Sequence, residues 1–320
     1  MVRRAPRGSI TALAAAGALA STGTAYVGAR SLFIVQAAKA RSVIPKSWDV
    51  PPRADGVYVA GGGPVQRWQR GVPFDLHLMV FGDSTATGYG CRTADEVPGV
   101  LIARGLAEHS GKRVRLSTKA LVGATSKGLS GQVDAMFVAG SPPDAAVILV
   151  GANDVIALNS IGASARRLGA AVRRLCASGA EVVVATCPDF GVVKAIPQPL
   201  RWTVRTRGLR LARAQSGAVR SAGGVPVPLA SLVNDEFRHS PELMLSDDRF
   251  HPSATGYALA ASQLLPALCN ALGDWAGAPA LPSATATEAG PGYSVLRLIS
   301  RLWRRPTTGV PAPFVVPAQG

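Results

Sequence analysis

Short apolar runs that alternate with helical patterns constrain the fold of this chain more than any other feature. Leu76–Phe81, Ala145–Val150 and Glu181–Ala185 have the length and composition of buried strands. Val114–Val122 is a further strand candidate, and Val225–Leu229 is a weaker one. Helical patterns occupy the segments Pro98–His109, Ser130–Ala139, Ile161–Ala177 and Ser253–Leu272. This alternation predicts an α/β fold with a mostly parallel sheet and right-handed crossovers. Ligands of such sheets bind at the carboxyl ends of the strands.

The two ends of the chain differ in composition from its middle. Residues 46–73 are rich in Pro, Gly and Arg and are predicted to be a linker and irregular lead-in, and residues 276–320 form a Pro- and Ala-rich tail. Residues 74–275 remain as one globular domain. Hydrophobic residues make up 48% of the chain and charged residues 17%, which favours a substantial core over disorder.

Residues 1–45 carry a localisation signal. Arg3, Arg4 and Arg7 precede an uncharged stretch, Gly8–Ala29, rich in Ala and Leu. A basic segment before an apolar one is typical of an export signal, and this stretch is also long enough to approach a membrane span. We therefore predict a signal peptide or an N-terminal membrane anchor, in preference to an Ala-rich helix packed on the domain. The protein is then extracellular, in the cell envelope or membrane-anchored.

The net charge of +15 is compatible with nucleic acid, anionic lipid or an anionic polymer as partner. No nucleic-acid motif and no stretch that interleaves aromatic with basic residues accompanies the charge, so we exclude nucleic acid and favour a solvated basic surface. Tyr293–Arg305, a short basic amphipathic segment, indicates an anionic membrane surface as a partner. A helix docked on the catalytic domain would show the same pattern.

Four cysteines, Cys91, Cys176, Cys187 and Cys269, form no C-x-x-C pair and have no histidine at zinc spacing. We predict no metal site from them. Export would permit disulfides, and three pairings are open.

The first candidate site follows the first strong strand, in Gly82-Asp83-Ser84. A serine at a strand end is exposed where a substrate can approach, but its hydroxyl is a weak nucleophile until a base takes its proton. The second site, Asp248-Arg249-Phe250-His251, supplies such a base. One local turn brings the carboxylate to the imidazole, where it orients the ring and stabilises the imidazolium. The other histidines, His77, His109 and His239, lack a carboxylate at this spacing.

The third site follows the most apolar strand, in Gly151-Ala152-Asn153-Asp154. The amide of Asn153 can donate to an oxyanion that forms on a substrate carbonyl, although a turn that caps the next helix has the same composition. Gly123 can add a backbone N–H. Gly123 and Gly128 also have the spacing of a phosphate-binding loop, but Leu129 occupies the required lysine position and excludes that interpretation.

Taken together, these blocks resemble the SGNH hydrolase family, also called GDSL-type esterases and lipases, over about residues 76–270. The resemblance implies a flavodoxin-like three-layer α/β/α sandwich and hydrolysis of carboxylic esters without a metal or other cofactor. Carried over, Ser84 is the nucleophile, His251 the base and acid, and Asp248 the orienting residue. The Ser84 and Gly123 N–H groups and the Asn153 amide form the oxyanion hole.

Three departures from the family pattern accompany the resemblance. Thr85 stands where the eponymous motif has Leu, no Asn precedes Gly123, and Asp247 adjoins Asp248 as a rival carboxylate. The expected substrate is a small-molecule or lipid acyl ester, attacked through an acyl-serine intermediate. Acyl transfer, thioester hydrolysis and deacetylation of a cell-envelope glycan would use the same triad. A non-catalytic envelope-binding module on the same fold is a further alternative.

Overall fold

The computed structural model describes residues 28, 31–39 and 50–273. At its centre lies a six-stranded sheet in the order β1-β3-β2-β4-β5-β6. The strands are β1 (Gly56–Tyr58), β2 (Leu76–Gly82), β3 (Val114–Thr118), β4 (Ala145–Leu149), β5 (Glu181–Ala185) and β6 (Val225–Val227). Strands β2 to β6 pair in parallel, and β1 pairs antiparallel with β3 at the edge.

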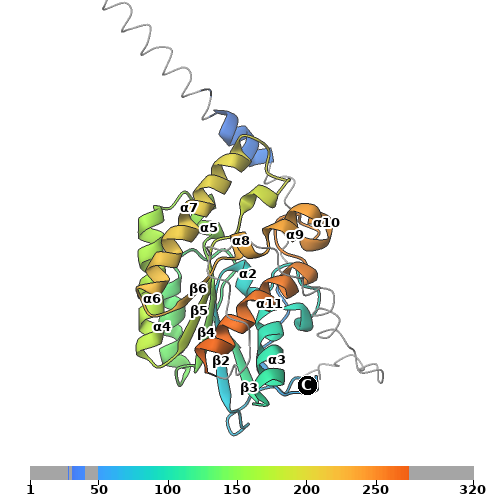
Figure 1. Ribbon diagram of the computed structural model, residues 1–320, viewed down its shortest axis with the longest axis vertical. Coiled ribbons are helices and arrows are strands. Elements are labelled where there is room, and N and C mark those ends of the chain that lie inside the picture. Colours follow the sequence, from blue (N-terminus) through green and yellow to red (C-terminus); the bar gives the residue numbers. More distant parts are fainter. Residues whose placement is uncertain (1–27, 29–30, 40–49, 274–320) are drawn as a thin grey trace, which may run out of the picture.

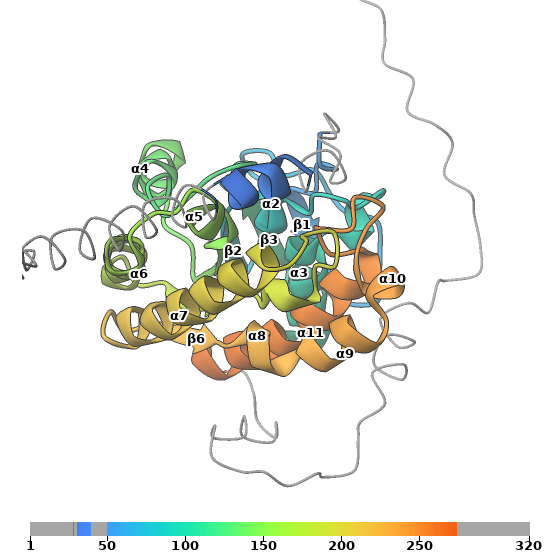
Figure 2. The same cartoon turned by 90° about the horizontal axis from the view of Figure 1, so that it is seen from above.

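Helices cover both faces of this sheet (Figures 1 and 2). One layer consists of α3 (Pro98–Ser110) and α11 (Ala254–Ala271), and the other of α4 (Leu129–Ala139), α6 (Ile161–Ala177) and α7 (Leu200–Arg220). The order of the five parallel strands is that of the flavodoxin-like doubly wound sheet. The predicted three-layer α/β/α sandwich with a mostly parallel sheet is confirmed.

Strand β2 shows why the central strands are apolar throughout. Leu78 and Val80 pack into the core beneath α3 and α11, whereas Met79 and Phe81 pack into the core on the opposite face. A strand that is buried on both faces has no polar alternation, so its sequence is a continuous apolar run.

Short helices fill most connections at the carboxyl edge of the sheet. They are α2 (Ser84–Thr87), η1 (Ala94–Glu96), α5 (Ala152–Ile156), η2 (Phe190–Val192), α8 (Leu229–Leu232), α9 (Asn234–His239) and α10 (Pro241–Met244). These connections leave strands at the edge where parallel sheets bind ligands.

Three elements differ from the sequence-based prediction. The predicted linker contains β1, whose three residues pair with β3 and are all buried. The strand predicted over Val114–Val122 ends at Thr118, and Leu121 and Val122 lie exposed in the following segment. Helix α7 was not predicted, because its arginines hide a thin buried stripe that includes Val204, Leu211 and Val219.

The described residues include only a small part of the two chain ends for which a membrane segment and an amphipathic helix are predicted. No helix among them is long and apolar enough to cross a membrane. Most of the predicted signal or anchor segment and the whole of Tyr293–Arg305 lie outside the described residues. All four cysteines lie inside them, and no disulfide joins any two.

Candidate active site

The end of β2 places Asp83 and Ser84 at the carboxyl edge of the sheet. Gly82 has a φ of 133°, and a Cβ there would lie 1.9 Å from the carbonyl oxygen of Leu149, so no other residue fits this close approach to β4. The Asp83 carboxylate then accepts the N–H of Thr85 at 2.9 Å and caps α2, whose first residue is Ser84. The serine is therefore held at a fixed strand-to-helix turn.

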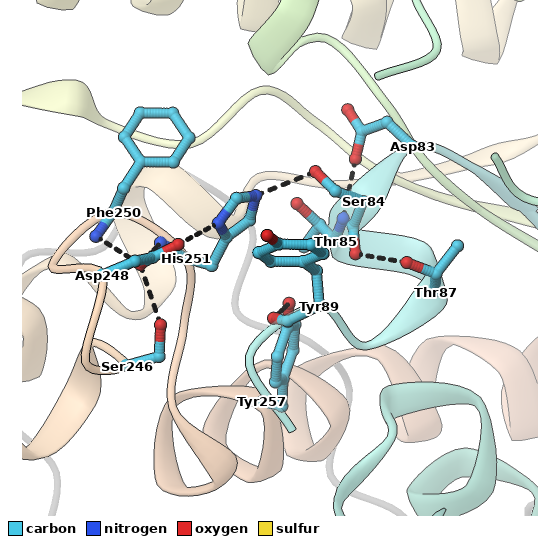
Figure 3. A network of polar contacts seen from close by, with 10 residues as sticks. All are labelled: Asp83, Ser84, Thr85, Thr87, Tyr89, Ser246, Asp248, Phe250, His251 and Tyr257. Carbon is cyan, nitrogen blue, oxygen red and sulfur yellow. Dashed lines mark hydrogen bonds and ion pairs between the residues drawn. The ribbon is translucent and has the colours of Figure 1, made fainter. Parts of the chain in front are cut away.

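Ser84, His251 and Asp248 form one hydrogen-bonded chain (Figure 3). Oγ of Ser84 lies 2.9 Å from Nε2 of His251, and Nδ1 of His251 lies 2.6 Å from Oδ2 of Asp248. A proton on Nδ1, facing the carboxylate, leaves Nε2 free to accept the serine proton. Residues 167 positions apart in the chain are thus brought into contact.

The loop before α11 fixes the orientation of Asp248. Its Oδ1 accepts hydrogen bonds from the Ser246 hydroxyl and from the backbone N–H groups of Phe250 and His251, each at 2.8 Å. Arg249 has a φ of 55°, in the left-handed region, which lets the loop fold back on the carboxylate. Burial by itself raises the pKa of Asp248, but the hydrogen bond and charge of His251 and these N–H groups outweigh it and lower the pKa below its usual value.

Two aromatic rings hold the imidazole of His251. The ring of Tyr89 lies 4.5 Å from it between centroids, and Phe250 meets it edge-on at 5.1 Å. Tyr257, fully buried in α11, donates its hydroxyl to the carbonyl of Tyr89 at 2.8 Å. Sequence reasoning did not identify Tyr89, Ser246 or Tyr257, because only the contacts of Tyr89 and Ser246 with the triad, and of Tyr257 with Tyr89, distinguish them from ordinary core and loop residues.

Three donors lie on the connections after β2, β3 and β4. Ser84 is the first residue of α2, a position whose N–H has no partner within its own helix. Gly123 has a φ of 80° in a turn closed by the hydrogen bond from Ala124 N to Leu121 O, and no described protein acceptor receives the Gly123 N–H. The Asn153 amide uses one N–H on the carbonyl of Ala124 at 2.9 Å and keeps its second donor.

Asp154, beside Asn153, joins two of these connections. Its carboxylate is buried and accepts hydrogen bonds from the backbone N–H and hydroxyl of Ser126, both at 2.8 Å. The side chains of Asn159 and Ser164 donate to the same carboxylate. Asp154 therefore connects the segment that carries Gly123 to the helix that carries Asn153. The last residue of the Gly-Ala-Asn-Asp block thus has a structural role.

Asp83 is the most buried carboxylate near the serine, with 1% of its surface exposed. Burial raises its pKa to about 6, against the opposing effects of the hydrogen bond from Thr85 and the charge of His251. The raised pKa reflects the cost of a charge in this interior.

An apolar cavity of about 110 Å³ adjoins His251 and Asp83. Apolar side chains from η2, α8 and α9, among them Phe190, Leu229 and Phe237, line it. An apolar cavity of ~150 Å³ can hold a benzene ring, so this one accommodates roughly four non-hydrogen atoms. The cavity can take an apolar portion of a substrate whose reacting carbon lies at Ser84.

The remaining candidate groups lie apart from this chain of contacts. Asp247 is exposed and pairs with Arg92 at 3.0 Å, so Asp248 is the carboxylate that meets the histidine. His77 lies within β2 and contacts the Ser117 hydroxyl at 2.9 Å. Within the described residues, no group of three or more His, Cys, Asp or Glu side chains is placed to hold a metal ion.

Comparison with known proteins agrees with these blocks. Residues 80–259 match the model of the GDSL-like Lipase/Acylhydrolase family. The GDSL-like esterase Rv1075c of Mycobacterium tuberculosis is 66% identical over 312 residues, which cover 96% of this chain and 99% of that protein.

Solved structures with lower identity are also similar. A lipase/acylhydrolase from Enterococcus faecalis has 23% identity and a TM-score of 0.47, covering 60% of this chain and 94% of the other. The esterase EstA from a Pseudoalteromonas species has 18% identity and a TM-score of 0.48, covering 62% and 100%. With more than half of its length matched by the family model and a full-length relative at 66% identity, this chain belongs to the GDSL-like lipase/acylhydrolase family, as its sequence blocks predict.

Proposed function

We propose that this protein is a serine esterase that hydrolyses carboxylic esters through an acyl-serine intermediate. The observation that carries the proposal is the continuous hydrogen-bonded chain from Ser84 through His251 to Asp248 at the carboxyl edge of the sheet. Membership of a lipase/acylhydrolase family supports the same reaction class.

The first half of the reaction transfers the acyl group to the enzyme. Nε2 of His251 takes the proton of Ser84 as Oγ attacks the ester carbonyl carbon. The carbonyl oxygen becomes an oxyanion, which the N–H groups of Ser84 and Gly123 and the Asn153 amide stabilise. The ester C–O bond then breaks, and the leaving alcohol takes the proton from His251.

The second half regenerates the serine. A water molecule gives a proton to Nε2 of His251 and attacks the acyl-serine carbonyl, and the same three donors stabilise the second oxyanion. Collapse releases the carboxylic acid and returns the proton to Oγ of Ser84. Asp248 keeps its charge throughout and stabilises the imidazolium that forms in each half. The proposed residues need no metal or cofactor for these steps.

The substrate that we propose is an acyl ester with a small apolar group next to the reacting carbon. The support is the apolar cavity of about 110 Å³ beside His251. A longer chain on the other side of the ester would lie outside this cavity, so small-molecule and lipid esters both remain substrates under this proposal.

Labelling with a serine-directed phosphonate tests the nucleophile. The full chain should gain one phosphonyl group, located by mass spectrometry on Ser84, and lose ester hydrolysis in parallel. Ser84→Ala should abolish both while the thermal unfolding curve stays close to that of the parent. Ser231→Ala, which removes an exposed hydroxyl in α8, serves as the control. Near-parental turnover by Ser84→Ala would exclude the mechanism.

We further propose that the enzyme is exported. The support is the basic segment at Arg3, Arg4 and Arg7 followed by the uncharged stretch Gly8–Ala29. Fusion of residues 1–45 to a reporter that is active only outside the cytoplasm tests this localisation, and an inactive but stable fusion would contradict it.

A further inference from the structure

The helix at residues 31–39 turns an apolar face away from the protein. Gln36 is buried, where its amide donates to the carbonyl of Gln198 and accepts the N–H of Leu200 at 3.0 Å. This contact joins the helix to the start of α7 (Figure 1). Leu32, Ile34 and Val35 point outward instead, with 47% to 64% of their surface exposed. A helix that is apolar on its outer face normally has a further apolar environment to cover it.

Further exposed apolar side chains lie at the same edge of the sheet. Leu121 and Val122 precede Gly123, Ile156 ends α5 and Leu158 lies two residues beyond it, and Trp202 lies in the first turn of α7. Each of these side chains is at least 51% exposed. Together with Leu32, Ile34 and Val35, we call these residues the apolar rim.

The parts of the apolar rim are joined by contacts. Asn153 in α5 donates to Ala124, next to the turn that carries Leu121 and Val122. Arg207 in α7 donates to the carbonyl of Asn159, at the end of the α5 connection. Gln36 then joins α7 to the helix at residues 31–39. Because Gly123 and Asn153 also carry two of the proposed oxyanion donors, the rim borders the mouth of the proposed site.

The side of the candidate site that carries the apolar rim differs in charge from the side formed by α9 and α10. Segments 121–127, 152–160 and 189–207 carry the exposed or half-exposed bases Lys127, Lys194 and Arg201, and their two carboxylates, Asp154 and Asp189, are buried. The acidic residues Asp235 and Glu242 belong to α9 and α10, on the opposite side of the site (Figure 1). Apolar side chains mixed with bases suit an anionic lipid surface.

The chain that precedes the helix favours lipid over a protein partner. Gly8–Ala29 is a run of 22 residues without charge that lies directly before it in sequence, separated only by Arg30. A helix of 22 residues is about 33 Å long, close to the ~30 Å hydrocarbon thickness of a bilayer. We propose that the apolar rim binds an anionic membrane surface and holds the mouth of the active site against it.

The experiment asks whether Trp202 meets acyl chains. The full chain is mixed with vesicles of phosphatidylcholine and phosphatidylglycerol whose acyl chains carry bromine, which quenches tryptophan at short range. The chain has five tryptophans, so the Trp202 signal is the difference between the parent and Trp202→Phe. We expect Trp202 to lose at least half of its emission in anionic vesicles and less in pure phosphatidylcholine.

Two exposed substitutions test the contact surface. Ile34→Glu combined with Leu158→Glu should reduce the quenching of Trp202 at least twofold, even where residues 8–29 keep the chain on the vesicles. Val138→Glu is the matched control, because Val138 is 89% exposed in the last turn of α4, at the opposite edge of the sheet. It should leave the quenching unchanged.

Three outcomes would overturn the proposal. The first is a vesicle-bound parent in which Trp202 is not quenched, and the second is equal quenching in the parent and in the Ile34→Glu, Leu158→Glu chain. The third is concentration-dependent dimerisation in solution that Ile34→Glu abolishes, since a second copy would then cover the rim. Hydrolysis of a small soluble ester, measured on the same samples, reports on the proposed esterase activity independently of the membrane contact.

Discussion

The carboxylate of Asp248 lies 2.6 Å from Nδ1 of His251 and also accepts the backbone N–H of that same histidine at 2.8 Å. The two contacts fix the imidazole relative to its own main chain. The hydrogen bonds that lower the pKa of Asp248 keep it ionised through the neutral range, where it can stabilise an imidazolium.

Asp248→Asn should lower kcat by roughly 10³–10⁴-fold, because an amide at this position favours the wrong tautomer of His251. Asp247→Asn is the control, since its carboxylate is exposed and pairs only with exposed Arg92, and such surface pairs contribute ~0–1 kcal/mol. Steady-state kinetics on one ester compares the two variants. A larger fall in kcat for Asp247→Asn than for Asp248→Asn would show that Asp247, and not Asp248, orients the imidazole.

Asn153→Ala should lower kcat by ~10²-fold or more with little change in KM, because the amide contact strengthens as the oxyanion forms. Asn270→Ala, an exposed residue of α11, should retain parental kinetics. A rise in KM without a fall in kcat would instead place Asn153 in ground-state binding.

Ala230→Phe should restrict hydrolysis to esters with a shorter group in the apolar cavity. Ala230 lines this cavity, and a phenyl ring would fill most of it. The expected effect on kcat/KM is small for an acetyl ester and about tenfold or more for a butanoyl ester, since each methylene in such a pocket contributes ~1–3 kcal/mol. Ester series that vary the acyl and the alcohol portions separately identify which portion occupies the cavity. Equal losses across both series would show that the cavity is not used by substrate.

Asp83→Asn should change how stability depends on pH. The pKa of Asp83 is raised from 3.8 to about 6 on folding, so the native state binds more protons and its stability falls as pH rises from about 4 to 6. At ~1.36 kcal/mol per pKa unit, the contribution lost is about 3 kcal/mol. Asparagine keeps an acceptor for Thr85 without the charge. Denaturant unfolding at pH 4 to 7 should show that the free energy of unfolding of the variant, relative to the parent, increases as pH rises. A difference that does not depend on pH would contradict the raised pKa of Asp83.

His77→Gln should change the dependence of stability on pH in the opposite direction. Burial, followed by the charge of Arg115, lowers the pKa of His77 from 6.5 to about 4, so the unfolded state binds more protons in that window. Stability from this group is present above pH 6.5 and is lost as pH falls toward 4. Glutamine can keep a hydrogen bond to Ser117. The variant should therefore lose less stability than the parent between pH 6.5 and 4, which the same unfolding series measures.

Local sequence determined the strands, most helices and the blocks of the site. Ala145–Leu149 was predictable because burial on both faces leaves a continuous apolar run, and Ile161–Ala177 because burial of one stripe leaves a helical period. The spacing of Asp248 and His251 was readable for a similar reason, since three residues place both groups on one loop. Helix α7 left a weaker trace because arginines surround its buried stripe, and β1 is too short to show a period.

The tertiary structure decided the relations between distant segments. Contact between Ser84 and His251, the packing of Tyr89 on the imidazole and the bond that joins Asp154 to Ser126 each depend on how the strands are ordered in the sheet. The orientation of the helix at residues 31–39 is of the same kind, because it depends on the hydrogen bond between Gln36 and Leu200, the first residue of α7. Sequence patterns record what each segment buries, whereas strand order and helix docking determine which buried or polar groups meet.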